Sequence, residues 1–157
     1  MTSMSLTLIP TRDTALLLPF LRDAEEGDRR IVQAIGNLAM TAYIAQDDKT
    51  IVGAVVMHWD THESEIVYIA TSEALRGKGY GKAIMQALIA EARQKGIHAL
   101  LVGTSNTSWD NIAFYQKCGF RMDSVRKDFF NYLPTPVYEN GIRMRDMLIL
   151  RLSLIDA

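Results

Sequence analysis

Residues 65–88 read EIVYIATSEALRGKGYGKAIMQAL and change character twice along their length. The opening part, Glu65–Thr71, is rich in β-branched and aromatic residues, which is typical of a strand. After a glycine-rich turn, apolar residues recur at helical spacing up to Lys95-Gly96, which predicts a helix that ends at its glycine. The sequence therefore places a glycine-rich loop directly before the first turn of a helix.

That loop reads Arg76-Gly77-Lys78-Gly79-Tyr80-Gly81 and is followed by Lys82. Glycine lets a backbone approach a ligand closely, and the free N–H groups of a helix's first turn attract an anion. The pattern predicts a phosphate cradle; the alternative is a tight turn with solvated basic residues. It is not a P-loop, because no Gly-Lys-Ser/Thr follows the required gap, and not the dinucleotide fingerprint, because its third glycine comes too early.

Toward the N-terminus, the pattern predicts a strand over Leu6–Ile9 and a helix over Ala15–Leu21 after the capping residues Thr11-Arg12-Asp13. We expect this helix to break near Leu18, because Pro19 lies inside it. After a turn, a second helix is expected, and its apolar positions define one buried face. The turn is Asp23–Asp28, and the helix is expected over Arg29–Leu38. Its buried positions are Ile31, Ile35 and Leu38, with Ala34 beside them.

The middle of the chain predicts an antiparallel meander, because short turns separate Ala42–Ala45, Ile51–Trp59 and Glu65–Thr71. Ala99–Val102 should pair in parallel with Glu65–Thr71, because a whole helix separates the two strands. The remaining expected elements are a helix capped by Ser108 and running to Lys117, a strand after Gly119-Phe120, and a last strand over Met147–Leu154.

Composition limits the classes of function. The chain has 157 residues, 48% hydrophobic and 22% charged, so we expect a single domain over residues 1–157. Its net charge of −1 gives no general affinity for nucleic acid or an anionic membrane. The single cysteine, Cys118, excludes an internal disulfide and a multi-cysteine zinc site and fits a cytoplasmic setting. Met1–Ser5 carries no positively charged residue, so no export signal is expected. No apolar run is long enough to span a bilayer, so no transmembrane helix is expected.

Two motifs together give the chain a family resemblance. Arg76-x-x-Gly79-x-Gly81 has the spacing of a pyrophosphate loop, and the segment FYQKCGF, residues 114–120, looks like a helix-to-strand connection ending in Gly-Phe. In this order, the chain resembles the GCN5-related N-acetyltransferase (GNAT) superfamily over nearly its whole length. The stretch Phe114–Met147 also looks like a bacterial subgroup of the YvbK type, which does not name the acceptor.

The resemblance implies a mixed α/β fold, with a mostly antiparallel sheet splayed between its fourth and fifth strands and helices on both faces. It also implies acetyl-CoA as co-substrate and no metal. In the family, loop amides hold the pyrophosphate, and the pantetheine arm runs along the end of the fourth strand. Carried over, the implied cofactor-binding residues are Ile69, Ala70, Thr71, Arg76, Gly77, Lys78, Gly79, Tyr80, Gly81 and Lys82. A backbone amide near Thr71 would hold the thioester carbonyl, in agreement with the oriented N–H that acyl transfer needs.

The resemblance implies two catalytic residues. Tyr115 occupies the position of the tyrosine that protonates the departing thiolate; the alternative is that its ring only packs under the last strands. Glu65 has a spacing similar to that of the general base in the histone-acetylating branch, and strand alternation predicts that it shares a face with Ile69 and Thr71. The alternatives for the base are a water chain or the nearby turn residues His62 and Glu63.

The chain departs from the family pattern at two places. Gly103 stands where the amino-terminal-acetylating branch has a glutamate, which argues against that branch's base. Ser108 stands where the family has an asparagine that contacts the pantetheine amide, and Asn106, two residues earlier, could take over that contact; Ser108 and Asn106 are both candidate cofactor-binding residues. Cys118 is expected to be a packed thiol, because direct transfer needs no nucleophile on the enzyme.

The expected function is transfer of an acetyl group from acetyl-CoA to a primary amine of a small molecule, by direct attack in a ternary complex. In the connection between the last two strands, Glu139 and Asp146 are candidates to attract a cationic amine; packed aromatics are the alternative. The competing functions are a protein or peptide amine acetyltransferase and a CoA-binding module without catalysis. A homodimer through the C-terminal strands is one expected assembly.

Overall fold

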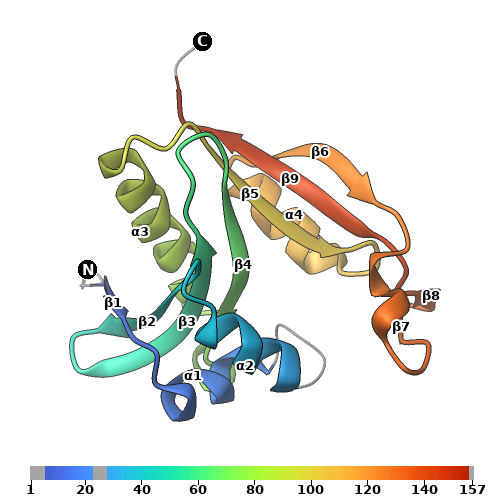
Figure 1. The fold of residues 1–157 in the computed structure, drawn as a ribbon, viewed down its shortest axis with the longest axis horizontal. Coiled ribbons are helices and arrows are strands. Elements are labelled where there is room, and N and C mark those ends of the chain that lie inside the picture. Colours follow the sequence, from blue (N-terminus) through green and yellow to red (C-terminus); the bar gives the residue numbers. More distant parts are fainter. Residues whose placement is uncertain (1–5, 23–27, 156–157) are drawn as a thin grey trace.

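The structure is a computed structural model that describes residues 6–22 and 28–155. The predictions for Met1–Ser5 and for the turn at 23–27 lie outside these residues. At the centre is a seven-stranded sheet in the order β1-β2-β3-β4-β5-β9-β6, antiparallel except for the parallel pair β4–β5 (Figure 1). Its strands are β1 (Leu6–Pro10), β2 (Thr41–Asp47), β3 (Thr50–His58), β4 (Ser64–Thr71), β5 (Ala99–Ser105), β6 (Arg121–Arg126) and β9 (Met147–Ser153).

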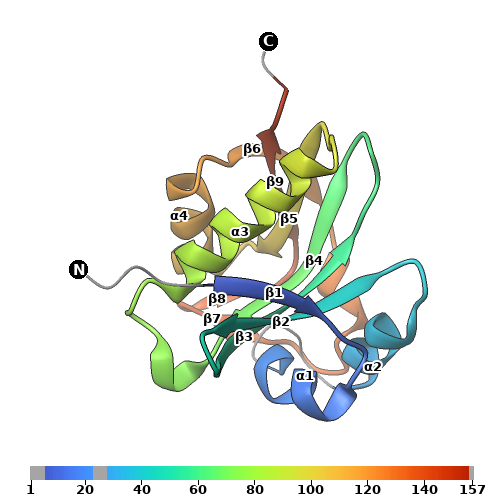
Figure 2. The same cartoon turned by 90° about the vertical axis from the view of Figure 1, so that its left-hand side faces the viewer.

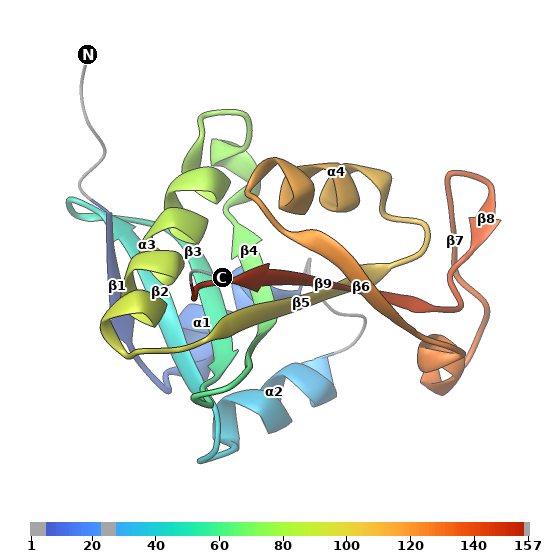
Figure 3. The same ribbon diagram turned by 90° about the horizontal axis from the view of Figure 1, so that it is seen from above.

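Helices cover both faces of this sheet, as the resemblance implied. α3 (Tyr80–Gln94) and α4 (Trp109–Lys117) lie on one face, and α1 (Thr14–Leu21) and α2 (Asp28–Gly36) lie on the other (Figures 2 and 3). Short 3₁₀ helices, η1 (Glu73–Leu75) and η2 (Phe129–Tyr132), and the hairpin β7 (Tyr138–Glu139) and β8 (Ile142–Arg143) complete the described elements.

Each face of the sheet has its own hydrophobic core. One core contains Ile84 and Leu88 of α3 together with Tyr115 of α4. The other contains Leu17 of α1 and Ile31 of α2. The membership of a strand residue in one core or the other therefore tells which face it occupies.

The sheet splays between β4 and β5. The two strands pair only at Ser64↔Leu100, Glu65↔Leu101 and Ile66↔Val102, and Figure 1 shows them diverging below this point. This leaves one edge of β4 beyond Ile66 without a strand partner. The parallel pairing and the splay between these strands were both expected.

A β-bulge in β4 changes the predicted alternation. Val56 of β3 pairs with Tyr68 while Met57 pairs with Ile66, so Val67 is an extra residue. Ile66 accordingly packs in the α3-side core, whereas Tyr68 packs in the α1–α2 core. The prediction that Glu65 shares a face with Ile69 and Thr71 is therefore wrong, because a bulge shifts a strand's alternation by one residue.

Two helix predictions also need correction. α1 continues through Pro19 without a break, because Leu17 and Leu21 are fully buried and Arg22 N–H still donates to Leu18 O at 3.1 Å. α2 ends at Gly36, so Leu38 lies beyond the helix and is 87% exposed instead of buried.

The connection between β6 and β9 forms a projection that we call the C-terminal arm, residues 127–146 (Figures 1 and 3). Its two ends are held together where Phe130 N–H donates to Arg145 O at 3.1 Å and Asp128 N–H donates to Asp146 Oδ1 at 2.9 Å. Among all described residues, no helix has the length and apolar character to cross a membrane.

Candidate active site

The glycine-rich loop is built to leave backbone N–H groups free. Gly77 and Gly79 have φ of +81° and +84°, a left-handed conformation that costs other residues conformational energy. α3 begins at Tyr80, no described side chain caps it, and its ladder starts with Ala83 N–H donating to Gly79 O at 3.1 Å. The first-turn N–H groups of Tyr80, Gly81 and Lys82 thus have no helical partner, which favours an anion at this end.

Gly81 marks where three elements meet. A Cβ at this position would lie 3.5 Å from Thr71 Oγ1 and 3.5 Å from Phe114 Cζ. The start of α3 is therefore packed against the end of β4 and against α4. The two predicted motifs, far apart in the sequence, meet at this point.

The β2–β3 hairpin supports the loop from the other side. Tyr80 Oη donates a hydrogen bond to Asp47 Oδ2 at 2.7 Å, and this bond to a carboxylate raises the pKa of Tyr80. No local pattern in the sequence indicates this contact, because it joins residues that are 33 positions apart. Because the hydroxyl of Tyr80 is bonded to Asp47, the group of Tyr80 that can bind an anion is its backbone N–H.

The open edge of β4 carries peptide groups directed into the splay. Ser72 N–H donates to Val52 O of β3 at 2.8 Å. Because peptide groups alternate along a strand, those of Ala70 also point to β3, and those of Ile69 and Thr71 point away from it, into the splay. Ile69 and Thr71 can thus pair with an extended ligand, and Ala70 lines the strand between them.

Tyr115 lies on α4 next to Phe114, the residue that contacts the start of α3, and is 6% exposed. Its ring makes edge contacts with Phe114 and Phe120 at centroid distances of 5.5 and 6.0 Å. Burial, with a smaller effect of Cys118, raises the pKa of Tyr115 to about 12. No described residue hydrogen-bonds its hydroxyl, so the phenol is neutral near pH 7 and can donate to a ligand atom.

Glu65 lies on the sheet face opposite α3, as the bulge requires. Its Oε1 is 3.7 Å from Arg126 Nη1 of β6, and its side chain is 33% exposed. This ion pair spans the splay from β4 to the far edge of the sheet. Sequence reasoning missed Arg126, because only the three-dimensional fold brings β6 to β4.

The two alternative bases are engaged elsewhere or lie at the surface. The Glu63 carboxylate forms an ion pair with Arg151. His62 is exposed and lies edge-on to His98, with ring centroids 5.3 Å apart.

Asn106 holds the C-terminal arm. Its Oδ1 accepts the N–H groups of Arg145 at 3.0 Å and Asp146 at 3.1 Å, and its Nδ2 donates to Arg143 O at 3.2 Å. These bonds use both ends of the amide. Its predicted contact to pantetheine stays a prediction, and the structure shows a different partner set.

Ser108 and Glu139 also belong to this attachment. Ser108 has the cap position of α4, but its hydroxyl donates to Glu139 Oε1 at 3.0 Å, so the expected side-chain cap is absent. Thr107 Oγ1 donates to the same carboxylate oxygen at 3.1 Å. The Glu139 carboxylate therefore ties the arm to the β5–α4 loop.

Gly103 and Cys118 are both packed against neighbouring side chains. A Cβ at Gly103 would lie 2.5 Å from Met147 Sδ, so Met147 fills the space that a side chain there would need. Cys118 is half-buried, and burial raises the pKa of its thiol, which disfavours the reactive thiolate.

The donor set fits a ligand with an anionic head and an extended, amide-bearing arm. Free helix N–H groups suit the head, and the open edge of β4 suits the arm. Within residues 6–22 and 28–155, no group of three or more His, Cys, Asp and Glu side chains could hold a metal ion.

Comparison with known proteins identifies the family. The profile of the acetyltransferase (GNAT) family matches residues 13–120. The chain belongs to the acetyltransferase (GNAT) family. A solved GNAT acetyltransferase from Elizabethkingia anophelis, with acetyl-CoA bound, is 33% identical, with a TM-score of 0.86 over 95% of this chain and 98% of that one.

Two proteins of Bacillus subtilis are also similar to this GNAT chain. An acetyltransferase solved in complex with CoA is 30% identical, with a TM-score of 0.86 over 98% of this chain and 100% of that one. The N-acetyltransferase YvbK is 42% identical over 91 residues, which are 57% of this chain and 59% of YvbK. The predicted family, fold class and enzyme class are confirmed, and the individual site residues remain predictions.

Proposed function

We propose that this protein transfers the acetyl group of acetyl-CoA to a primary amine of a small molecule, by direct attack in a ternary complex. The observation that carries the proposal is the uncapped start of α3 packed against the open end of β4, with Tyr115 on the neighbouring helix, 6% exposed and with no described hydrogen-bond partner for its hydroxyl. The relatives solved with acetyl-CoA and CoA support the choice of co-substrate.

The proposed binding site divides the co-substrate among three parts of the chain. The N–H groups of Gly79, Tyr80, Gly81 and Lys82 hold the pyrophosphate, and the basic side chains of the loop add positive charge. The peptide groups of Ile69 and Thr71 pair with the pantetheine amides. Bound in this way, acetyl-CoA supplies an acetyl group activated as a thioester.

Acetyl transfer forms one bond and breaks another. The amine nitrogen bonds to the acetyl carbon, the carbon–sulfur bond breaks, and the proton lost by nitrogen balances the proton gained by the thiol. An N–H group of the β4 edge stabilises the carbonyl oxygen as negative charge develops on it. No covalent intermediate on the protein is required.

Glu65 and Tyr115 act at the two ends of this proton transfer, from opposite faces of the sheet. Glu65, directly or through water, accepts the proton of the amine, which approaches from the face of α1 and α2. Tyr115 donates a hydrogen bond to the departing sulfur. Because its pKa is about 12, the phenol is protonated throughout the physiological range.

The test is thiol release from acetyl-CoA with a panel of amines, using wild type, Tyr115→Phe and Gln116→Ala. Gln116 is exposed on the same helix and provides the control. We expect amine-dependent release, a fall in kcat of about 100-fold in Tyr115→Phe at equal CoA affinity, and no change in Gln116→Ala.

Other outcomes separate the role of Tyr115 from the function. Full turnover in Tyr115→Phe would show that Tyr115 has no role in the chemical step. CoA binding without thiol release from acetyl-CoA in the presence of any small amine would overturn the proposal and favour a protein acceptor or a binding module.

A cytoplasmic location and a homodimer belong to this proposal as well. Size-exclusion chromatography with light scattering tests the dimer.

A further inference from the structure

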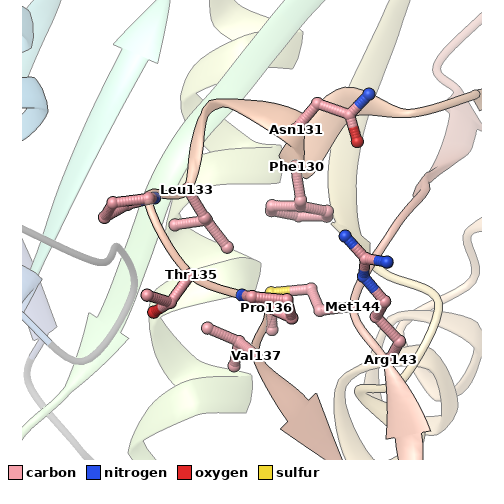
Figure 4. Close-up of a pocket in the computed structure, with 9 residues that line it drawn as sticks. Phe130, Asn131, Leu133, Thr135, Pro136, Val137, Arg143 and Met144 are labelled. Atoms are coloured by element: carbon pink, nitrogen blue, oxygen red, sulfur yellow. The ribbon is translucent and has the colours of Figure 1, made fainter.

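The C-terminal arm encloses a pocket of about 380 Å³. Its apolar walls include Phe130 of η2, Leu133, Val137 and Met144, and Arg143 is the charged residue among the described side chains that line it (Figure 4). Figure 4 shows the guanidinium directed toward Phe130, beside Met144. A guanidinium that no carboxylate accompanies can pair with an anionic group of a ligand.

Arg143 has no carboxylate partner among the described residues. It is half-buried, and within the described part of the chain its guanidinium makes no hydrogen bond or ion pair, since only its backbone O accepts a bond, from Asn106. The two carboxylates expected to attract a cationic amine are both bound elsewhere. Glu139 accepts from Thr107 and Ser108, and Asp146 accepts from Asp128 N–H.

The arm is held at the mouth of the splay, on the face where Glu65 lies. Arg126, at the end of β6 just before the arm, is 3.7 Å from Glu65. Arg30 of α2 lies over the ring of Tyr132 in η2 at 4.0 Å. The arm thus contacts α2 through Tyr132, and β6, the strand that leads into the arm, reaches β4 through Arg126.

We propose that Arg143 binds an oxyanion of the acceptor, so that the preferred substrates are amines carrying a carboxylate and not polyamines. This inference rests on the proposed function and names its substrate class. A guanidinium pairs with a carboxylate through two parallel N–H···O bonds, which orient the acceptor as well as bind it. The apolar side chains that line the pocket would contact the carbon chain next to the carboxylate.

The test compares each amino acid of a panel with its amide, the alkylamine lacking the carboxylate, and the corresponding aminophosphonate. We expect kcat/KM for the acid to exceed that for the amide by about 10- to 100-fold, as a charge-assisted hydrogen bond provides. Arg143→Gln should raise KM for the acid by a similar factor and leave the amide unchanged, and Arg143→Lys should partly restore the acid. Arg145→Gln, an exposed neighbour outside the pocket, is the control.

A binding readout separates this inference from the proposed function. Titration of the protein with the amino acid, without acetyl-CoA, should shift an arginine Nε–H NMR signal that is missing in Arg143→Gln. That shift without any thiol release would support the anion site and contradict the transferase. Transfer to acid and amide at equal rates, or an equal loss of both in Arg143→Gln, would overturn the inference; a preference for the phosphonate would replace the carboxylate by a phosphate-type group.

Discussion

Tyr115 shows how burial sets the state of a reactive side chain. The motif identified Tyr115 and its neighbour Phe120, but the burial of Tyr115 also depends on α3, which only the fold brings to it. The unfavourable transfer of a phenolate from water into this core raises the pKa of Tyr115 to about 12. The same shift that keeps the phenol protonated makes the fold sensitive to alkali.

The sign of that sensitivity follows from linkage. The unfolded phenol has a pKa near 10, below the folded value of about 12, so the stabilisation is complete below pH 10 and declines as pH rises toward 12. Between about pH 9 and about pH 11, the free energy of unfolding should fall in both proteins. The fall should be larger in wild type than in Tyr115→Phe, by about 1.4 kcal/mol. Urea unfolding at the two pH values measures this difference.

Tyr138→Phe is the control for that experiment, because Tyr138 is 65% exposed. It should follow wild type at both pH values. If Tyr115→Phe also follows wild type, the phenol is not buried as described.

Glu65 marks the limit of sequence reasoning at the scale of single residues. The residue type and its strand could be predicted, but its face could not. The bulge at Val67 depends on the register with β3, and the ion pair depends on Arg126, a residue distant in the chain. Neither leaves a local pattern in the sequence.

At the scale of elements, β3 and β4 must lie close together at the open end of the splay. A Cβ at Gly53 would lie 2.4 Å from Ala70 O and 2.8 Å from Ile84 Cδ1. The first contact is with backbone, which cannot rotate away. This glycine is therefore needed for packing between β3, β4 and α3.

Gly53→Ala should lower the free energy of unfolding by about 1–3 kcal/mol, because it overpacks the core. Gly36→Ala is a matched control, since a Cβ at Gly36 meets nothing within 4 Å. We expect the control to be neutral or slightly stabilising. Urea midpoints that agree between the two variants would contradict the described packing.

Elements with a clear periodicity and loop length could be predicted, including the β2–β3 hairpin and the parallel β4–β5 pair. Errors arose where tertiary packing outweighed a local rule. Pro19 stays inside α1 because Leu17 and Leu21 are buried, and Ser108 bonds to Glu139 instead of capping α4. Local preference is weaker than these long-range contacts.

At the scale of the whole molecule, the splay separates two approaches to one site. The uncapped start of α3 and Tyr115 lie on one face of the sheet, and Glu65 and the arm lie on the other. The motifs named individual residues for the first side, and the roles of those residues stay predictions. The second side could be predicted only in outline, because the arm is positioned by contacts such as Asn106 with the backbone of Arg145 and Asp146.

The most direct test of the account follows the acetyl group itself. Acetyl-CoA labelled with ¹³C at the acetyl carbonyl is incubated with the protein and an amine, and the carbonyl signal is followed by NMR. The account predicts that the thioester signal disappears as an amide signal grows in equal amount, with release of free thiol. Label that collects in free acetate, or stays in the thioester while the protein binds acetyl-CoA, would contradict the assignment as an N-acetyltransferase.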